Sequence, residues 1–266
     1  MANQKATLNH HAGAVLAYHN NPEKGLVFVL EQKDPDFRPP FFDNGLCFLG
    51  GNWQRGVHKD SSPRETMSRE VREEFWEIYE APESLNSILG QEFLTREPDI
   101  VARYSEREIQ RIREVGRILI NGTTYAADYV LSFFPPLFKA ALTCGCTIFT
   151  KPLSGEELMT IEGVVQEFDG RLTTDNLKYK SSTVVVSLRE INLRNIKFAY
   201  QYDHVLNDLL DHELSSMTEQ RIVRTLSPHL TKVQRFTYPK GFQVKDPSNG
   251  PTYDELQSAG LEYLQR

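Results

Sequence analysis

The sequence contains little cysteine, no long apolar run and no excess of positive charge. Its three cysteines, Cys47, Cys144 and Cys146, lack the spacing of a disulfide framework or a zinc site, so we expect free thiols. No stretch of about 18 apolar residues occurs, which excludes a membrane-spanning helix. The polar residues 1–11 lack the apolar core of a secretory signal. These absences predict a protein of the reducing cytoplasm that does not interact with a membrane.

The charge balance also narrows the range of partners. The formal net charge is -6. Proteins that bind nucleic acid usually carry a basic surface, so this balance argues against nucleic acid as a partner. A small phosphate ligand stays compatible with it, because a bound metal ion can supply the local positive charge. The 266 residues, of which 39% are hydrophobic, suffice for one large domain with a core.

The most informative segment is an acidic helix predicted from Pro63 to about Ile78. Its apolar stripe, at spacings of four, four and three, consists of Met67, Val71, Phe75 and Ile78. Its acidic face, at helical spacings, consists of Glu70, Glu73, Glu74 and Glu77. Carboxylates stacked in this way repel one another, and a hard divalent cation such as Mg²⁺ or Mn²⁺ would relieve the repulsion. The alternative is a solvated surface face whose charges pair locally with Arg69 and Arg72.

The residues before this helix favour the cation. An apolar strand from Gly45 to Leu49 is followed by a glycine pair, Gly50-Gly51. Ser62 then offers a capping hydroxyl, Pro63 occupies the first helical position, and Glu65 follows Ser62 by three residues. The resulting order is strand, glycine turn, loop and capped acidic helix.

The run Arg69-Glu70-Val71-Arg72-Glu73-Glu74 resembles the second half of the box that defines the Nudix hydrolases. The resemblance implies a mixed β-sheet between helices, covering residues 8 to about 214. It implies hydrolysis of a nucleoside diphosphate linked to another group, with a small-molecule nucleotide as substrate. It also implies that Glu70, Glu73 and Glu74 hold Mg²⁺ or Mn²⁺, and that the carbonyl of Gly51 adds a ligand.

Three departures from that box suggest an alternative. Ser61 stands where the family usually has glutamate, although Asp60 is adjacent. Trp76 replaces the glycine that ends the family's helix, so we expect the helix to run on to Glu77 and Ile78. The loop after Gly51 is also longer than usual. A sensor of the same fold that binds a nucleotide without cleaving it is therefore the second hypothesis, and a scaffold for protein interactions is a weaker third.

Other candidate residues surround this motif. The general base is expected between Ser154 and Asp169, with Glu157 and Glu162 preferred over Glu156 and Glu167. Arg69 is interpreted as an ion-pair partner that orients the acidic face. Trp53 is the aromatic residue to test for stacking on a base, although aromatic residues more often belong to the core. His10 and His11 point to opposite sides of an extended chain and are not expected to share a metal.

The order of elements predicts an α/β or α+β sandwich with a C-terminal helical extension. Strands are expected at 12–18, 25–31, 46–49, 125–134, 147–153 and 182–188. Helices are expected at 63–78, 99–114, 155–168, 190–214 and 253–265, and residues 84–89 form a short helix or strand. Residues 117–121 are expected to start a hairpin around Asn121-Gly122. We divide the chain into a catalytic domain, residues 1–214, and an extension, residues 215–266. The extension is expected to pack as a tail, with a lid or the arm of a homodimer as alternatives.

Overall fold

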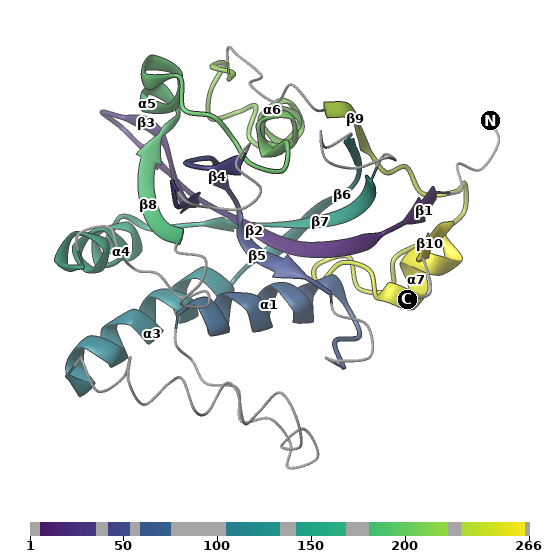
Figure 1. Ribbon diagram of the computed structural model, residues 1–266, viewed down its shortest axis with the longest axis horizontal. Helices are drawn as coiled ribbons and strands as arrows, with labels where there is room; N and C mark the ends of the chain where they lie inside the picture. The colour runs from purple at the N-terminus through teal and green to yellow at the C-terminus, as the bar shows by residue number, and fades with distance from the viewer. Residues whose placement is uncertain are drawn as a thin grey trace.

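The computed structural model describes residues 6–35, 42–53, 59–75, 105–133, 142–168, 181–222 and 230–263. They form an α+β fold in which an eight-stranded mixed sheet lies between helices (Figure 1). The strands are β1 (Ala6–Leu8), β2 (His10–Asn21), β3 (Gly25–Lys33), β4 (Leu46–Cys47), β5 (Leu49–Asn52), β6 (Thr124–Phe133), β7 (Leu142–Pro152), β8 (Ser181–Ser187), β9 (Leu230–Arg235) and β10 (Leu261–Tyr263). The helices are α1 (Pro63–Glu74), α3 (Glu106–Ile120), α4 (Gly155–Glu167), α5 (Leu188–Arg194), α6 (Tyr202–His212) and α7 (Tyr253–Ser258).

The long strand β2 organises the sheet. It pairs in parallel with β7 on one side and, near its end, in antiparallel with β3 on the other. Beyond Val29, β3 pairs with β4, and β5 lies beside residues 12–15 of β2. The other edge of β3 pairs with β8. Gly50 has a φ of 137°, and a side chain there would collide with the backbone of Gly13. The glycine pair thus lets β5 lie close to β2 just before α1 begins.

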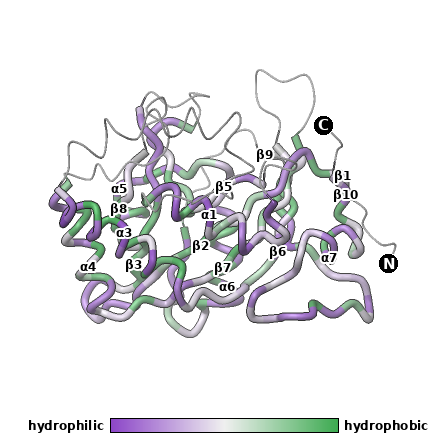
Figure 2. The backbone as a smooth tube through the Cα atoms, turned by 90° about the horizontal axis from the view of Figure 1, so that it is seen from below, coloured by the Kyte–Doolittle hydropathy of each residue, from purple (hydrophilic) through white to green (hydrophobic). Residues whose placement is uncertain are grey.

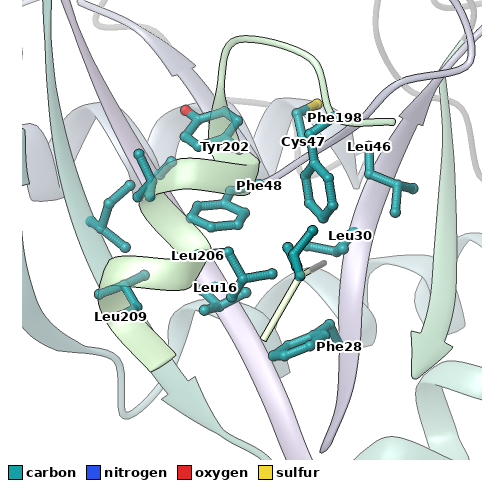
Figure 3. Close-up of a cluster of buried hydrophobic side chains, with 14 of the residues drawn as sticks. Leu16, Phe28, Leu30, Leu46, Cys47, Phe48, Phe198, Tyr202, Leu206 and Leu209 are labelled. Atoms are coloured by element: carbon teal, nitrogen blue, oxygen red, sulfur yellow. The ribbon is translucent and has the colours of Figure 1, made fainter. Parts of the chain in front are cut away.

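One face of the sheet is covered by α5 and α6 (Figure 1). In Figure 3, side chains of the sheet meet those of α6 in a cluster that includes Leu16, Phe28, Leu30, Phe48, Tyr202, Leu206 and Leu209. The rings of Phe48 and Tyr202 stack with their centroids 4.4 Å apart. Alternate residues of β2 and β3 point to this face, as the period of a strand requires.

The opposite face is covered by α1, α3 and α4 (Figure 1). The apolar stripe predicted for the acidic helix is confirmed here, because Met67, Val71 and Phe75 are all fully buried. Most other residues of α1 are polar, and the helix lies against β2 and β5 (Figure 2). Burial of this stripe fixes the rotation of α1, and so decides where its carboxylates point.

Two predicted helix boundaries differ from the structure. The described helix α1 ends at Glu74, with Phe75 as its C-cap. Trp76, Glu77 and Ile78, on which the predicted continuation depended, lie outside the described residues, as do residues 84–89. The prediction that residues 117–121 begin a hairpin is wrong: α3 continues to Ile120, and Asn121 is its C-cap. Its apolar stripe continues through Val115 and Leu119, which are fully buried, and this packing outweighs the turn propensity of Asn-Gly.

The single helix predicted for residues 190–214 is also wrong. The structure has two helices there, α5 and α6. Asn195, Tyr200 and Gln201 adopt left-handed backbone conformations between them. Phe198 forms a β-bridge with Leu46, so a tertiary contact draws the chain out of helical conformation at this point.

The C-terminal segment contains more than the expected helix. Strand β9 pairs with β6 at the edge of the main sheet, and β10 pairs with β1. The predicted helix 253–265 is shorter, since α7 ends at Ser258. Four residues form a small separate core there: Leu8, Tyr253, Leu256 and Leu261. The division of the chain at residue 214 stays a prediction. In the described part of the chain, no helix is long and apolar enough to cross a membrane.

Candidate functional site

The start of α1 is fixed by a reciprocal cap. The Ser62 hydroxyl accepts a hydrogen bond from the Glu65 backbone N–H at 3.2 Å. In return, the Glu65 carboxylate accepts one from the Ser61 N–H at 2.6 Å. Together with Pro63 in the first turn, these bonds start the helix where the sequence predicts it.

Arg69 lies at the centre of the acidic cluster. Its Nε donates to Asp60 Oδ2 at 3.1 Å, and its Nη1 lies 2.9 Å from Glu70 Oε1. The same Nη1 donates to both carboxylate oxygens of Glu73 at 3.2 Å. Arg69 is therefore paired with three carboxylates, one of which, Asp60, lies outside the helix.

Burial and charge act on Arg69 in opposite directions. Its side chain is only 3% exposed, and this desolvation lowers the pKa of the guanidinium. The neighbouring carboxylates of Glu70, Glu73 and Asp60 outweigh it, so the pKa lies above its ordinary value. Arg69 thus contacts three carboxylates at once, Asp60, Glu70 and Glu73.

The glycine predicted as a metal ligand lies against this cluster. A Cβ at Gly51 would overlap the carboxylate of Glu70, so the backbone of β5 and this side chain touch only because residue 51 is glycine. A carboxylate of the helix therefore lies against the end of the strand, and carboxylate and carbonyl oxygens are the donors that suit Mg²⁺ or Mn²⁺. Within the described residues, no three His, Cys, Asp or Glu side chains are already arranged to hold a metal ion. Because Glu70 and Glu73 contact Arg69, they would have to turn from it to bind one.

A second buried polar cluster, which sequence reasoning missed, lies next to Glu74. Lys33 Nζ donates to Glu31 Oε1 at 2.6 Å, and Cys47 Sγ donates to Glu31 Oε2 at 3.0 Å. Burial raises the pKa of Cys47, and the charges of Glu31 and Glu74 raise it further. The alternation of residues along β3 could have indicated this cluster from the sequence. Glu31 and Lys33 continue the same strand face as Val29, which packs toward α1.

The two glutamates predicted as general bases have partners of their own. Glu157 caps α4 by accepting from the Ser154 N–H at 2.7 Å, and it accepts from Lys151 Nζ at 2.9 Å. Its burial raises the pKa of this carboxyl, but the bonds from Lys151 and Ser154 lower it more, and the net shift is downward. Glu162 pairs with Lys24 at 3.9 Å. A general-base role for either residue stays a prediction.

The remaining candidates fill structural positions. One face of Trp53 is covered by Tyr253, with ring centroids 3.7 Å apart and planes at 10°. His11 is fully buried, and its Nε2 lies 2.8 Å from Thr147 Oγ1. Burial lowers the pKa of His11 to about 3. None of the three cysteines forms a disulfide, and all three are buried.

Comparisons with known proteins give two weak likenesses. No family model matches the sequence. No curated protein matches it either. Among solved structures, the chain is similar to a NUDIX hydrolase from Alicyclobacillus acidocaldarius, at 12% identity and a TM-score of 0.43, over 82% of this chain and 99% of that one. It is also similar to the Nudix hydrolase RenU from M. smegmatis, at 9% identity and a TM-score of 0.34, over 82% of this chain and 95% of that one.

Proposed function

We propose that this chain is a metal-dependent hydrolase of the Nudix type, which cleaves the phosphoric anhydride of a nucleoside diphosphate linked to another group. The observation that carries the proposal is the arrangement around Arg69. Two carboxylates of the box-like motif, Glu70 and Glu73, meet there beside the backbone of Gly51. The match of residues 69–74 to the family's motif supports it from the sequence.

Each candidate residue has its own role in the proposed reaction. Glu70, Glu73 and Glu74, with the carbonyl of Gly51, would hold the cation. When bound, Mg²⁺ or Mn²⁺ neutralises phosphate charge and makes a coordinated water more acidic. Arg69 holds the carboxylates on one face of α1 and limits their mutual repulsion while the site contains no cation.

The proton that the attacking water loses needs an acceptor on this chain. Glu157 and Glu162 remain our candidates for the general base. To act, Glu157 would have to exchange its bond with Lys151 for one with water, while its low pKa makes it a weak base. The sequence also predicts a cytoplasmic protein and leaves a homodimer open, and we retain both as proposals.

A panel of nucleotides tests the function. The purified protein is incubated with sugar nucleotides of the ADP-ribose type, dinucleotides and nucleoside triphosphates, with Mg²⁺ or Mn²⁺. Released phosphate and nucleoside monophosphate are measured, and binding of each compound is measured in parallel. Metal-dependent cleavage of any compound supports the enzyme. Tight binding of a compound without cleavage favours the non-cleaving sensor instead.

A further inference from the structure

We propose that the C-terminal segment is part of the acidic-helix site, and that Tyr253 is a positioning residue that holds Arg69 through Thr66 and Asp60. The inference rests on the proposed function, because it concerns the same carboxylates. It assigns a role to a residue 187 positions from Thr66 in sequence, in a segment first interpreted as a packed tail.

The start of α7 lies against the start of α1. The Tyr253 N–H donates to the carbonyl of Ser61 at 3.0 Å. The Tyr253 hydroxyl lies 2.7 Å from Thr66 Oγ1, inside the first turns of α1. Thr66 is fully buried and Tyr253 is 4% exposed. Water therefore does not compete for these two hydroxyls, and each depends on the other as a partner.

The hydrogen bonds run in one direction toward Arg69. Thr66 Oγ1 donates its only proton to Asp60 Oδ2 at 3.0 Å, so the Tyr253 hydroxyl must be the donor to Thr66. The same Asp60 oxygen accepts from Arg69 Nε at 3.1 Å. These hydrogen bonds thus stabilise the buried carboxylate of Asp60. They also fix the Nε edge of the guanidinium, which is the edge that does not contact Glu70 and Glu73.

The ring of Tyr253 is held on both sides. Trp53 stacks on one face, and His11 meets the ring edge to face with centroids 5.6 Å apart. Trp53 follows β5 directly, and Arg69 Nη2 donates to the carbonyl of Asn52 at 3.4 Å. The ring contacts of Tyr253 and its series of hydrogen bonds therefore both lead to residues 52–53, next to Gly51.

This arrangement affects how readily the carboxylates bind a cation. Arg69 competes with a metal ion for Glu70 and Glu73. While Asp60 holds Nε, the guanidinium is kept at the edge of the cluster. The bond from Thr66 fixes the position of the Asp60 carboxylate opposite Nε. Without it, this carboxylate can turn away, and the guanidinium moves further onto Glu70 and Glu73. The bond from Tyr253 is thus expected to favour metal binding.

The test measures Mn²⁺ binding and hydrolysis in the unmodified full chain, in four single variants and in one double variant. Tyr253→Phe keeps the ring and its stacking but removes the hydroxyl. Thr66→Val removes the hydroxyl that links Tyr253 to Asp60, and Thr66→Ser restores a hydroxyl at this position. Tyr129→Phe is the matched control, because the hydroxyl of this fully buried residue donates to Asp208 of α6 at 2.6 Å, on the face of the sheet opposite to α1.

We expect Tyr253→Phe and Thr66→Val each to weaken Mn²⁺ binding by about three- to tenfold, the usual effect of one hydrogen bond. Thr66→Ser and Tyr129→Phe should bind as the unmodified chain does. Combining Tyr253→Phe with Thr66→Val should weaken binding no further than Thr66→Val alone, because both changes break one chain of bonds. The metal concentration for half-maximal hydrolysis should rise by the same factor in the two variants.

Several outcomes would overturn the inference. Equal Mn²⁺ binding by Tyr253→Phe and the unmodified chain would contradict it and leave the proposed function intact. An equal loss in Tyr129→Phe would mean a general effect of stability, which melting temperatures would show. Failure of the unmodified chain to bind Mn²⁺ would instead overturn the proposed function itself.

Discussion

Asp60 Oδ2 lies 3.1 Å from Arg69 Nε, and both side chains are almost completely buried. The sequence has serine at position 61, where the related motif has glutamate. The neighbouring aspartate supplies the carboxylate that Ser61 lacks, one position earlier in the chain. We propose that the Asp60–Arg69 pair takes over this support of the acidic face.

Loss of this support should cost stability. We expect Asp60→Asn to lower the free energy of unfolding by about 1 to 3 kcal/mol, less than a fully broken buried pair because Arg69 keeps Glu70 and Glu73. Urea unfolding measures the difference. Asp43→Asn is the control, since Asp43 pairs with Lys197 at a site one-third exposed, where about 1 kcal/mol or less is expected. Equal losses in the two variants would contradict the role of Asp60.

A glutamate at position 61 should add little. If Asp60 already braces Arg69, Ser61→Glu should leave metal-dependent hydrolysis within a few-fold, a change of under roughly 1 kcal/mol in the barrier. The measurement is the rate on whichever compound of the nucleotide panel is cleaved. If the unmodified chain binds a nucleotide without cleaving it and Ser61→Glu turns hydrolysis on, the sensor hypothesis is favoured.

The carboxylates of α1 should be dispensable for folding. We expect Glu73→Gln and Glu74→Gln to abolish turnover without lowering the melting temperature, because each removes one charge from a cluster of like charges. The Glu73 side chain is 28% exposed, so its pair with Arg69 contributes little to stability. Glu114→Gln on α3, where Glu114 is exposed and pairs with Arg117, is the control for activity. A variant that melts well below the parent would show that the residue is structural.

Acid should destabilise the protein through His11. Its pKa is about 3 in the folded chain and 6.5 in the unfolded one, so protonation favours unfolding. This contribution to stability is complete above pH 6.5 and falls by about 1.4 kcal/mol for each pH unit between 6.5 and 3. Urea unfolding from pH 7 to 5 should show a shallower pH dependence in His11→Gln. His212→Gln, at an exposed position on α6, should keep the parent's slope, and identical slopes in all three would contradict the assignment.

The elements predicted correctly carry strong local signals. The start of α1 follows from Ser62 and Pro63, and β3 follows from an unbroken apolar run. The errors arise where tertiary contacts override local preference. Asn121-Gly122 ends a helix because the stripe through Leu119 packs on the core, and the bridge between Phe198 and Leu46 separates α5 from α6.

In the candidate site, too, some contacts follow from the sequence and others depend on tertiary packing. The helical spacing of Glu70, Glu73 and Glu74 places them on one face from sequence alone. The contribution of Tyr253 could not be predicted, because its partner Thr66 is 187 residues away and both look like ordinary core or helix residues. Spacing reveals contacts within one element, whereas contacts between distant elements depend on how those elements pack.

The central claim is that the acidic face of α1 holds divalent cations. The most direct measurement is anomalous scattering from crystals soaked in Mn²⁺, combined with calorimetric titration of the same protein. We predict manganese peaks at Glu70, Glu73 and Glu74, beside the Gly51 carbonyl, and loss of the binding heat in Glu73→Gln. A folded sample that binds no ion at this face in millimolar Mn²⁺ would contradict the account.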